Sequence, residues 1–143
     1  MKFWDSSAVV PLLVPEAMSR SLQGLYDADP VMFAWWGTEI ECTSAIARRQ
    51  RFGPLREDVV AEAFARLSAL RAGWHEVEPG DELRESAKRL LRVHDLRTAD
   101  ALQLAAAVFV AEARPSTLEF VSLDDRLLAA ARREGFPTTR STP

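Results

Sequence analysis

Apolar side chains recur with a helical spacing over much of the chain. Between positions 55 and 70 they fall every three or four residues, at Val59, Val60, Ala63, Phe64, Leu67 and Leu70. This period predicts an amphipathic helix. The same spacing, read with the Gly, Pro and capping signals around each segment, predicts further helices over residues 8–13, 19–27, 38–52, 81–93, 99–113 and 125–133. Ser6 or Ser7 is expected to cap the helix over residues 8–13, and Thr98 the helix over residues 99–113.

Short apolar runs between these helices predict strands. They cover residues 3–4, 31–34, 74–77 and 118–123, with a last short candidate at 136–139. Strands that alternate with helices indicate a mostly parallel sheet covered by helices on both faces, which is the α/β class. No linker interrupts the pattern, and 143 residues are enough for a substantial core, so we expect residues 1–143 to form a single domain.

Three aspartates stand where an apolar run gives way to a predicted helix: Asp5, Asp100 and Asp124. Each one alone could be a helix cap or a first-turn anion. Together they would share the edge at which parallel strands end and ligands bind. Clustered carboxylates repel one another, so such a site needs a cation, and oxygen ligands suit Mg²⁺ or Mn²⁺. The pattern therefore predicts a divalent-metal enzyme that acts on phosphate esters.

A glutamate from the helix over residues 38–52 could join this cluster. Glu39 and Glu41 are two positions apart, so they face nearly opposite sides of a helix and only one can take part. Helix phase alone does not decide between them.

Four segments of the chain resemble, in order and spacing, the acidic motifs of PIN-domain ribonucleases. They are residues 3–10 (FWDSSAVV), 41–48 (ECTSAIAR), 96–105 (LRTADALQLA) and 120–127 (FVSLDDRL). The resemblance is closest to the VapC toxins of type II toxin–antitoxin systems and covers nearly the whole chain. It implies a three-layer α/β/α sandwich with a mostly parallel central sheet of four or five strands.

The resemblance also implies which residues carry the chemistry. It places the family's acids, as catalytic residues and metal ligands, on Asp5, Glu41, Asp100 and Asp124, and so selects Glu41 over Glu39. It places a supporting hydroxyl on Ser7. Asp125 departs from the usual pattern and is a candidate extra acid beside the site.

The function implied is a Mg²⁺- or Mn²⁺-dependent endoribonuclease that hydrolyses phosphodiester bonds in RNA. Water activated by the metal would attack the phosphate in line, without a covalent enzyme intermediate. The resemblance further implies a cognate VapB-type antitoxin and a homodimer. Three arginines near the acidic motifs are candidates for binding substrate phosphates: Arg48, Arg97 and Arg126.

Composition narrows the setting of this activity. The net charge of −3 argues mildly against a general nucleic-acid binder. The single cysteine, Cys42, excludes an internal disulfide and agrees with a reducing compartment. No apolar run approaches the length of a membrane span and no signal peptide is evident, so a cytoplasmic location is expected.

Other functions remain open at this stage. A receiver-like, phosphoryl-accepting signalling domain also has acids at strand ends, but it needs a lysine near a late strand end, where neither Lys2 nor Lys88 lies. A phosphatase of the haloacid-dehalogenase type needs a second aspartate where Ser7 stands. A catalytically silent PIN-fold binding module is a further alternative, which the four intact acids disfavour.

Overall fold

A computed structural model describes residues 1–139 and 143 of the chain. Across this part, β1 (Lys2–Trp4), β2 (Met32–Trp35), β3 (His75–Val77) and β4 (Glu119–Val121) form one four-stranded sheet in the order β3-β2-β1-β4. All three strand pairings are parallel. β1 therefore lies inside the sheet, and the carboxyl ends of all four strands meet at one edge. The α/β class and the four- or five-stranded parallel sheet predicted from the sequence are confirmed.

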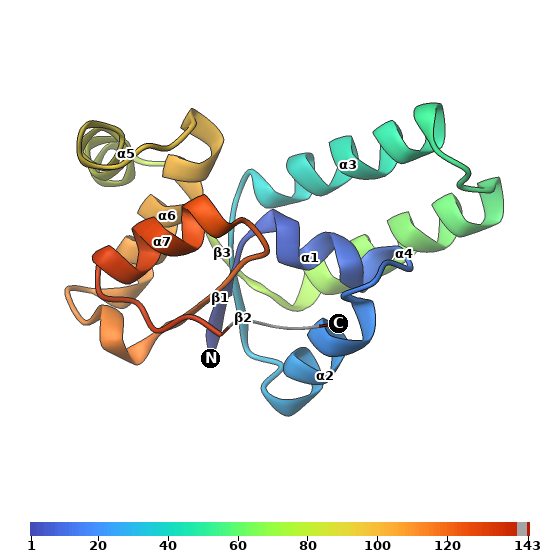
Figure 1. Ribbon diagram of the computed structural model, residues 1–143, viewed down its shortest axis with the longest axis horizontal. Coiled ribbons are helices and arrows are strands. Elements are labelled where there is room, and N and C mark those ends of the chain that lie inside the picture. The colour runs from blue at the N-terminus through green and yellow to red at the C-terminus, as the bar shows by residue number, and fades with distance from the viewer. Residues whose placement is uncertain (140–142) are drawn as a thin grey trace.

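Helices cover both faces of this sheet (Figure 1). One layer consists of α1 (Ser6–Leu13), α2 (Ser19–Ala28), α3 (Thr38–Phe52) and α4 (Glu57–Gly73). The opposite layer consists of α5 (Asp81–Val93), α6 (Thr98–Ala111) and α7 (Asp125–Arg133), and a 3-10 turn, η1 (Pro115–Thr117), leads into β4. The result is the three-layer arrangement that the alternating pattern predicts.

The alternation of side chains along β1 divides the core between the two layers. Phe3 and Trp4 are both fully buried, but Phe3 packs with the α5–α7 layer and Trp4 with the α1–α4 layer. Successive side chains of a strand point to opposite faces, so one short strand serves both cores. Phe3 also stacks on Phe120 of β4 with ring centroids 5.5 Å apart.

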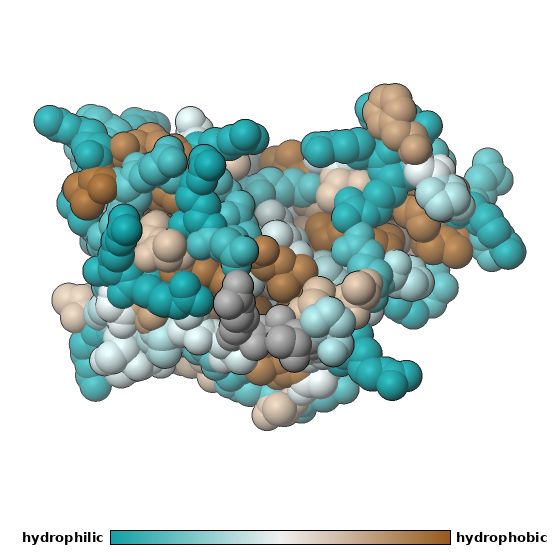
Figure 2. Space-filling view, viewed as in Figure 1, coloured by the Kyte–Doolittle hydropathy of each residue, from teal (hydrophilic) through white to brown (hydrophobic). Residues whose placement is uncertain are grey.

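Alanines let α6 approach the sheet closely. Ala101, Ala105, Ala106 and Ala107 are fully buried, and α6 packs against both α5 and β2. No helix within residues 1–139 combines the length and the apolar character that crossing a membrane requires. The visible face of the molecule is largely hydrophilic, with separate apolar patches between the polar side chains (Figure 2).

Two predicted helix caps are wrong. The N-cap of α1 is Asp5, whose side chain accepts a hydrogen bond from the Ser7 backbone N–H, so Ser6 and Ser7 are the first helical residues. Thr98 is likewise the first residue of α6, after an Arg97 N-cap that makes no capping side-chain bond. The predicted helices are otherwise present, with limits that differ by no more than a few residues.

Three strands are shorter than predicted, and β3 is so by one residue only. β4 ends at Val121, because the Leu123 N–H donates to the Ser7 hydroxyl and the Ser122 side chain turns toward Asp5. The strand expected at residues 136–139 is a single parallel bridge between Phe120 and Thr138. Pro137 accepts from the Phe120 N–H but has no N–H of its own, so this ladder does not extend.

The shared aromatic packing of β1 and β4 gives a test of this core. Phe120→Ala should lower the free energy of unfolding by about 3–5 kcal/mol, because it removes the fully buried ring that contacts Phe3 and Phe136. Phe52→Ala, at a side chain that is 82% exposed, should change it by less than about 0.5 kcal/mol. Urea unfolding of both variants measures the difference, and similar losses would contradict the assigned core.

Candidate active site

Asp5 lies at the carboxyl end of β1 and is almost completely buried, with 3% of its surface exposed. Its Oδ2 accepts hydrogen bonds from the Ser7 hydroxyl, from the Ser7 N–H at 3.3 Å and from the Ser122 hydroxyl at 2.8 Å. The pKa of Asp5 is raised to about 6, chiefly by burial. The hydrogen bonds from the two hydroxyls lower it, and the charges of Glu41 and Asp100 raise it; both effects are included in this value. The other oxygen, Oδ1, receives only a long contact of 3.5 Å from the Ser6 hydroxyl among the described residues.

Two serines join the end of β1 to the end of β4. The Ser7 hydroxyl accepts from the Leu123 N–H at 2.9 Å, and the Ser122 hydroxyl accepts from the Asp124 N–H at 3.0 Å. The two hydroxyls lie 3.2 Å apart. The structure thus places Ser7 against Asp5, as expected of a supporting hydroxyl. Ser122 was not among the predicted site residues; its signal was a small hydroxyl residue directly after the apolar pair Phe120 and Val121, two positions before Asp124.

The two glutamates of α3 point in different directions. Glu41 receives the Ser6 hydroxyl on Oε2 at 2.6 Å and the Gln103 amide on Oε1 at 3.2 Å. Glu39 instead pairs with Arg71 of α4 at 2.9 Å. Burial raises the pKa of Glu41, the hydrogen bonds from Ser6 and Gln103 lower it, and the charge of Asp100 raises it further. The geometry therefore directs Glu41, and not Glu39, toward Asp5.

Asp100 enters the site differently from the other aspartates. It does not follow a strand, as the sequence pattern suggested, but lies in the first turn of α6, after a short loop from α5. The packing of α6 against β2 and α5 sets its position. Burial and the charge of Asp124 raise its pKa, whereas a backbone hydrogen bond from Arg97 and the charges of Arg97 and Arg126 lower it.

Asp124 has a structural role as well as a place near the site. It is the N-cap of α7, and its Oδ1 accepts a hydrogen bond from the Leu127 N–H at 3.0 Å. The capping interpretation of this residue is thus realised. Its second carboxylate oxygen remains available for a ligand, and its charge is felt by Asp100.

The four predicted acids form a connected electrostatic group. The charge of Glu41 acts on Asp5, that of Asp100 on both Asp5 and Glu41, and that of Asp124 on Asp100. Within residues 1–139 and 143, however, no three His, Cys, Asp or Glu side chains are close enough together to hold a metal ion as they stand. A hard, oxygen-only donor set, in which Asp5, Glu41 and Asp100 have raised pKa values, fits a divalent cation, but not all of its side chains are yet close enough together to bind one.

A cleft of about 670 Å³ lies along α3, and of the four acids Glu41 lines it. It is lined by Ser6, Ser7, Val10, Glu16, Ile40, Glu41, Ser44, Ala45, Arg48, Arg49 and Leu123. The structure therefore brings Arg48 into the same cleft as Glu41. The neighbouring Arg49 is held by Glu16, with Nε 2.7 Å from the carboxylate.

The remaining candidates lie around the α6 and α7 ends of the site. Arg97 and Arg126 are both exposed. Their positive charges lower the pKa of Asp100, which places both arginines near this carboxylate. Arg126 also lies 3.9 Å from Asp95. Asp125 is exposed in the first turn of α7, and its part in the site stays a prediction.

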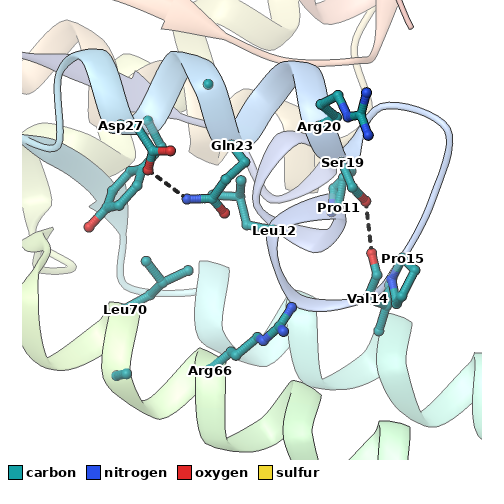
Figure 3. A pocket seen from close by; sticks show the side chains of 13 residues that line it. Pro11, Leu12, Val14, Pro15, Ser19, Arg20, Gln23, Asp27, Arg66 and Leu70 are labelled. Atoms are coloured by element: carbon teal, nitrogen blue, oxygen red, sulfur yellow. Dashed lines mark hydrogen bonds between the residues drawn. The ribbon is translucent and has the colours of Figure 1, made fainter.

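A larger cavity, of about 940 Å³, lies elsewhere, between α1, α2 and α4 (Figure 3). Its one acidic lining residue is Asp27, which accepts a hydrogen bond from Gln23 at 2.8 Å. None of the predicted catalytic residues lines it. The chemistry of the smaller cleft, rather than the size of the larger cavity, therefore identifies the candidate active site.

Known proteins resemble this chain in sequence and in fold. Two curated relatives, ribonuclease VapC45 and ribonuclease VapC49 of Mycobacterium tuberculosis, are each 31% identical to the chain over 110 residues, which is 77% of this chain and 76% of the relative. The chain belongs to the VapC ribonuclease family. The resemblance seen in the four acidic motifs is thereby confirmed. No protein-family model matches the chain.

Solved structures agree with this membership at the level of the fold. FitAcB from Neisseria gonorrhoeae has a TM-score of 0.69 at 15% identity, covering 98% of this chain and 97% of that one. A toxin–antitoxin complex from Klebsiella pneumoniae has a TM-score of 0.67 at 15% identity, with the same coverage. M. tuberculosis VapC20, described as a sarcin–ricin loop cleaving toxin, has a TM-score of 0.66 at 22% identity, covering 98% and 99%.

The buried carboxyl of Asp5 makes the stability of the metal-free protein depend on pH. Its pKa is about 6 in the native state against an ordinary 3.8, so the native state binds this proton more tightly, and the resulting stability is lost as pH rises through about 6. Asn cannot ionise. Asp5→Asn should therefore gain about 2.5 kcal/mol relative to the native protein between pH 4 and pH 7.5.

Urea unfolding in the presence of a chelator measures this gain. Asp81→Asn, at a side chain that is 95% exposed, is the matched control and should move by less than about 0.5 kcal/mol over the same range. If the stability difference between Asp5→Asn and the native protein does not vary with pH, the raised pKa of the buried Asp5 carboxyl is contradicted.

Proposed function

We propose that this VapC-family chain is a divalent-metal-dependent endoribonuclease that hydrolyses phosphodiester bonds in RNA. The observation that carries the proposal is the connected group of buried and half-buried carboxylates at the carboxyl edge of the sheet, three of them with raised pKa values. Membership of a ribonuclease family supports an endoribonuclease toxin as the function of such a site.

The metal would be held by the carboxylates of Asp5, Glu41, Asp100 and Asp124. Mg²⁺ or Mn²⁺ at that position supplies Lewis acidity, which lowers the pKa of a water and offsets the charge that develops on a phosphate. Ser7 and Ser122 hold Oδ2 of Asp5 and leave Oδ1 for ligation. Asp124 contributes the oxygen that does not cap α7.

RNA phosphates would reach the site through the cleft along α3. Arg48 lines this cleft, while Arg97 and Arg126 lie beside Asp100, outside its lining. Positive charge at these points offsets the repulsion between an acidic site and an anionic substrate. An open cleft suits single-stranded or looped RNA better than a duplex.

A protein partner is part of the same proposal. One structural neighbour is a toxin–antitoxin complex from Klebsiella pneumoniae, which supports an antitoxin as the partner that silences this chain. A VapB-type antitoxin, a homodimeric state and a cytoplasmic location complete the proposal.

The receiver-like alternative loses support from the positions of the two lysines. Lys2 lies at the amino end of β1 and pairs with Glu119 at 2.8 Å, whereas Lys88 is on the exposed face of α5 beside Glu85. Neither lysine approaches the carboxyl edge of the sheet, so both lie away from the place where such a domain requires a lysine beside its phosphorylated aspartate.

The divergent directions of Glu41 and Glu39 provide a matched pair of variants. Glu41→Gln should lower Mn²⁺-dependent cleavage of mixed RNA by at least the 100-fold or so that loss of an outer partner of a metal site can cost. Glu39→Gln removes the same charge from the same helix, but the Glu39 side chain faces Arg71 and not the site. The Glu39→Gln variant should therefore cleave RNA at nearly the native rate. Gel analysis of the products decides, and equal activity of both variants would contradict the proposed site.

Arg48 gives a second test, directed at substrate binding. Arg48→Gln should raise the KM for RNA and make the dependence of log affinity on log salt shallower by about 0.7, as expected for one lost phosphate contact to a single strand. Arg51→Gln changes another exposed arginine of α3 that does not line the cleft and should leave both quantities unchanged. The same response from both variants would rule out a specific phosphate contact at Arg48.

A further inference from the structure

Gln103 connects the two helical layers at the active site. It lies on α6, one turn after Asp100, and its side chain is fully buried. The amide nitrogen, Nε2, donates to Glu41 Oε1 at 3.2 Å and to the hydroxyl of Thr38 at 3.0 Å. Thr38 is itself buried in the first turn of α3. A single amide group therefore ties α6 to the beginning of the helix that carries Glu41.

The other end of this amide is left without a partner. Among the described residues, Gln103 Oε1 is a buried oxygen that accepts no hydrogen bond. Rotating the amide by half a turn would not help, because an ionised Glu41 can only accept hydrogen bonds and would then face an oxygen. The contact with Glu41 thus fixes the orientation of the amide and leaves its oxygen unpaired.

Stability alone does not account for this arrangement. A buried acceptor without a donor costs free energy, and an apolar side chain of the same size would avoid the cost. The neighbouring buried positions of α6 are apolar: Ala101, Leu104, Ala105, Ala106 and Ala107. Buried polar groups of this kind are usually satisfied by an internal water that makes several hydrogen bonds.

We infer that Gln103 is a positioning residue of the catalytic site, which fixes Glu41 through Nε2 and holds an internal water through Oε1. The inference rests on the proposed function. Ser6 holds the second oxygen of Glu41, so both carboxylate oxygens are oriented before any ligand arrives. A glutamate side chain loses rotational freedom when it binds a metal, and a partner that has already fixed its orientation reduces this entropic cost.

Calorimetric titration of the full chain with Mn²⁺ alone tests the inference. Gln103→Met keeps the size and removes both hydrogen-bonding atoms. It should weaken Mn²⁺ binding by about 10- to 100-fold while leaving the melting temperature equal to or above that of the native protein. Leu104→Met, the next buried position of α6, is the matched control and should bind Mn²⁺ as the native protein does.

The outcomes separate this inference from the function on which it rests. If native protein and Gln103→Met bind Mn²⁺ equally, the role of Gln103 is wrong and the metal site stands. If the native protein itself binds no Mn²⁺, the proposed function is wrong, and this inference with it.

A measurement on the native protein covers the case in which the variant fails to fold. A crystal structure that orders internal waters should show a water about 2.7–3.2 Å from Gln103 Oε1. An oxygen in contact with apolar atoms alone would overturn the inference.

Discussion

The burial of one carboxylate, Asp5, is the constraint on which the site depends. Removing a carboxylate from water is costly unless hydrogen bonds or opposite charge replace the solvent. Here two hydroxyls and the N-terminus of α1 offset part of that cost. The remainder, together with the charges of Glu41 and Asp100, appears as a pKa of about 6 for Asp5. A bound cation would offset both the burial of this carboxylate and its repulsion by the neighbouring acids. The interactions that destabilise the metal-free protein therefore favour metal binding.

The fold brings the acidic side chains together by drawing on the sheet and on both helical layers. β1 lies inside the sheet and delivers Asp5, while β4 beside it delivers Ser122 and, two residues later, Asp124. Glu41 arrives from α3 on one face, and Asp100 from α6 on the other. The hydrogen bond between Glu41 and Gln103 closes the gap between these layers. Four segments that are distant in the sequence thus contribute acidic side chains to one edge of the sheet.

Local patterns predicted most of this framework, whereas the contacts inside the site depend on distant residues. The limits of α3, α5 and α7 coincide with the predicted ranges, because periodic apolar positions and turn residues are local signals. The cap that Asp5 makes is local, because its donor is the Ser7 N–H two residues later. The early end of β4 and the contact of Ser122 with Asp5 instead depend on hydrogen bonds across 116 and 117 positions. The choice of Glu41 over Glu39 came from the family resemblance, since helix phase left both open, and Gln103 gave no local signal of its role. Whether the four acids act in catalysis is still a prediction.

The most direct test of the account is anomalous diffraction from crystals of the native protein soaked in Mn²⁺. The account predicts a manganese peak about 2.0–2.2 Å from carboxylate oxygens of Asp5 and Asp100, with Glu41 and Asp124 bound directly or through water. Carboxylates at positions 5, 41, 100 and 124 that surround no manganese, or that face separate sides of the molecule, would contradict it.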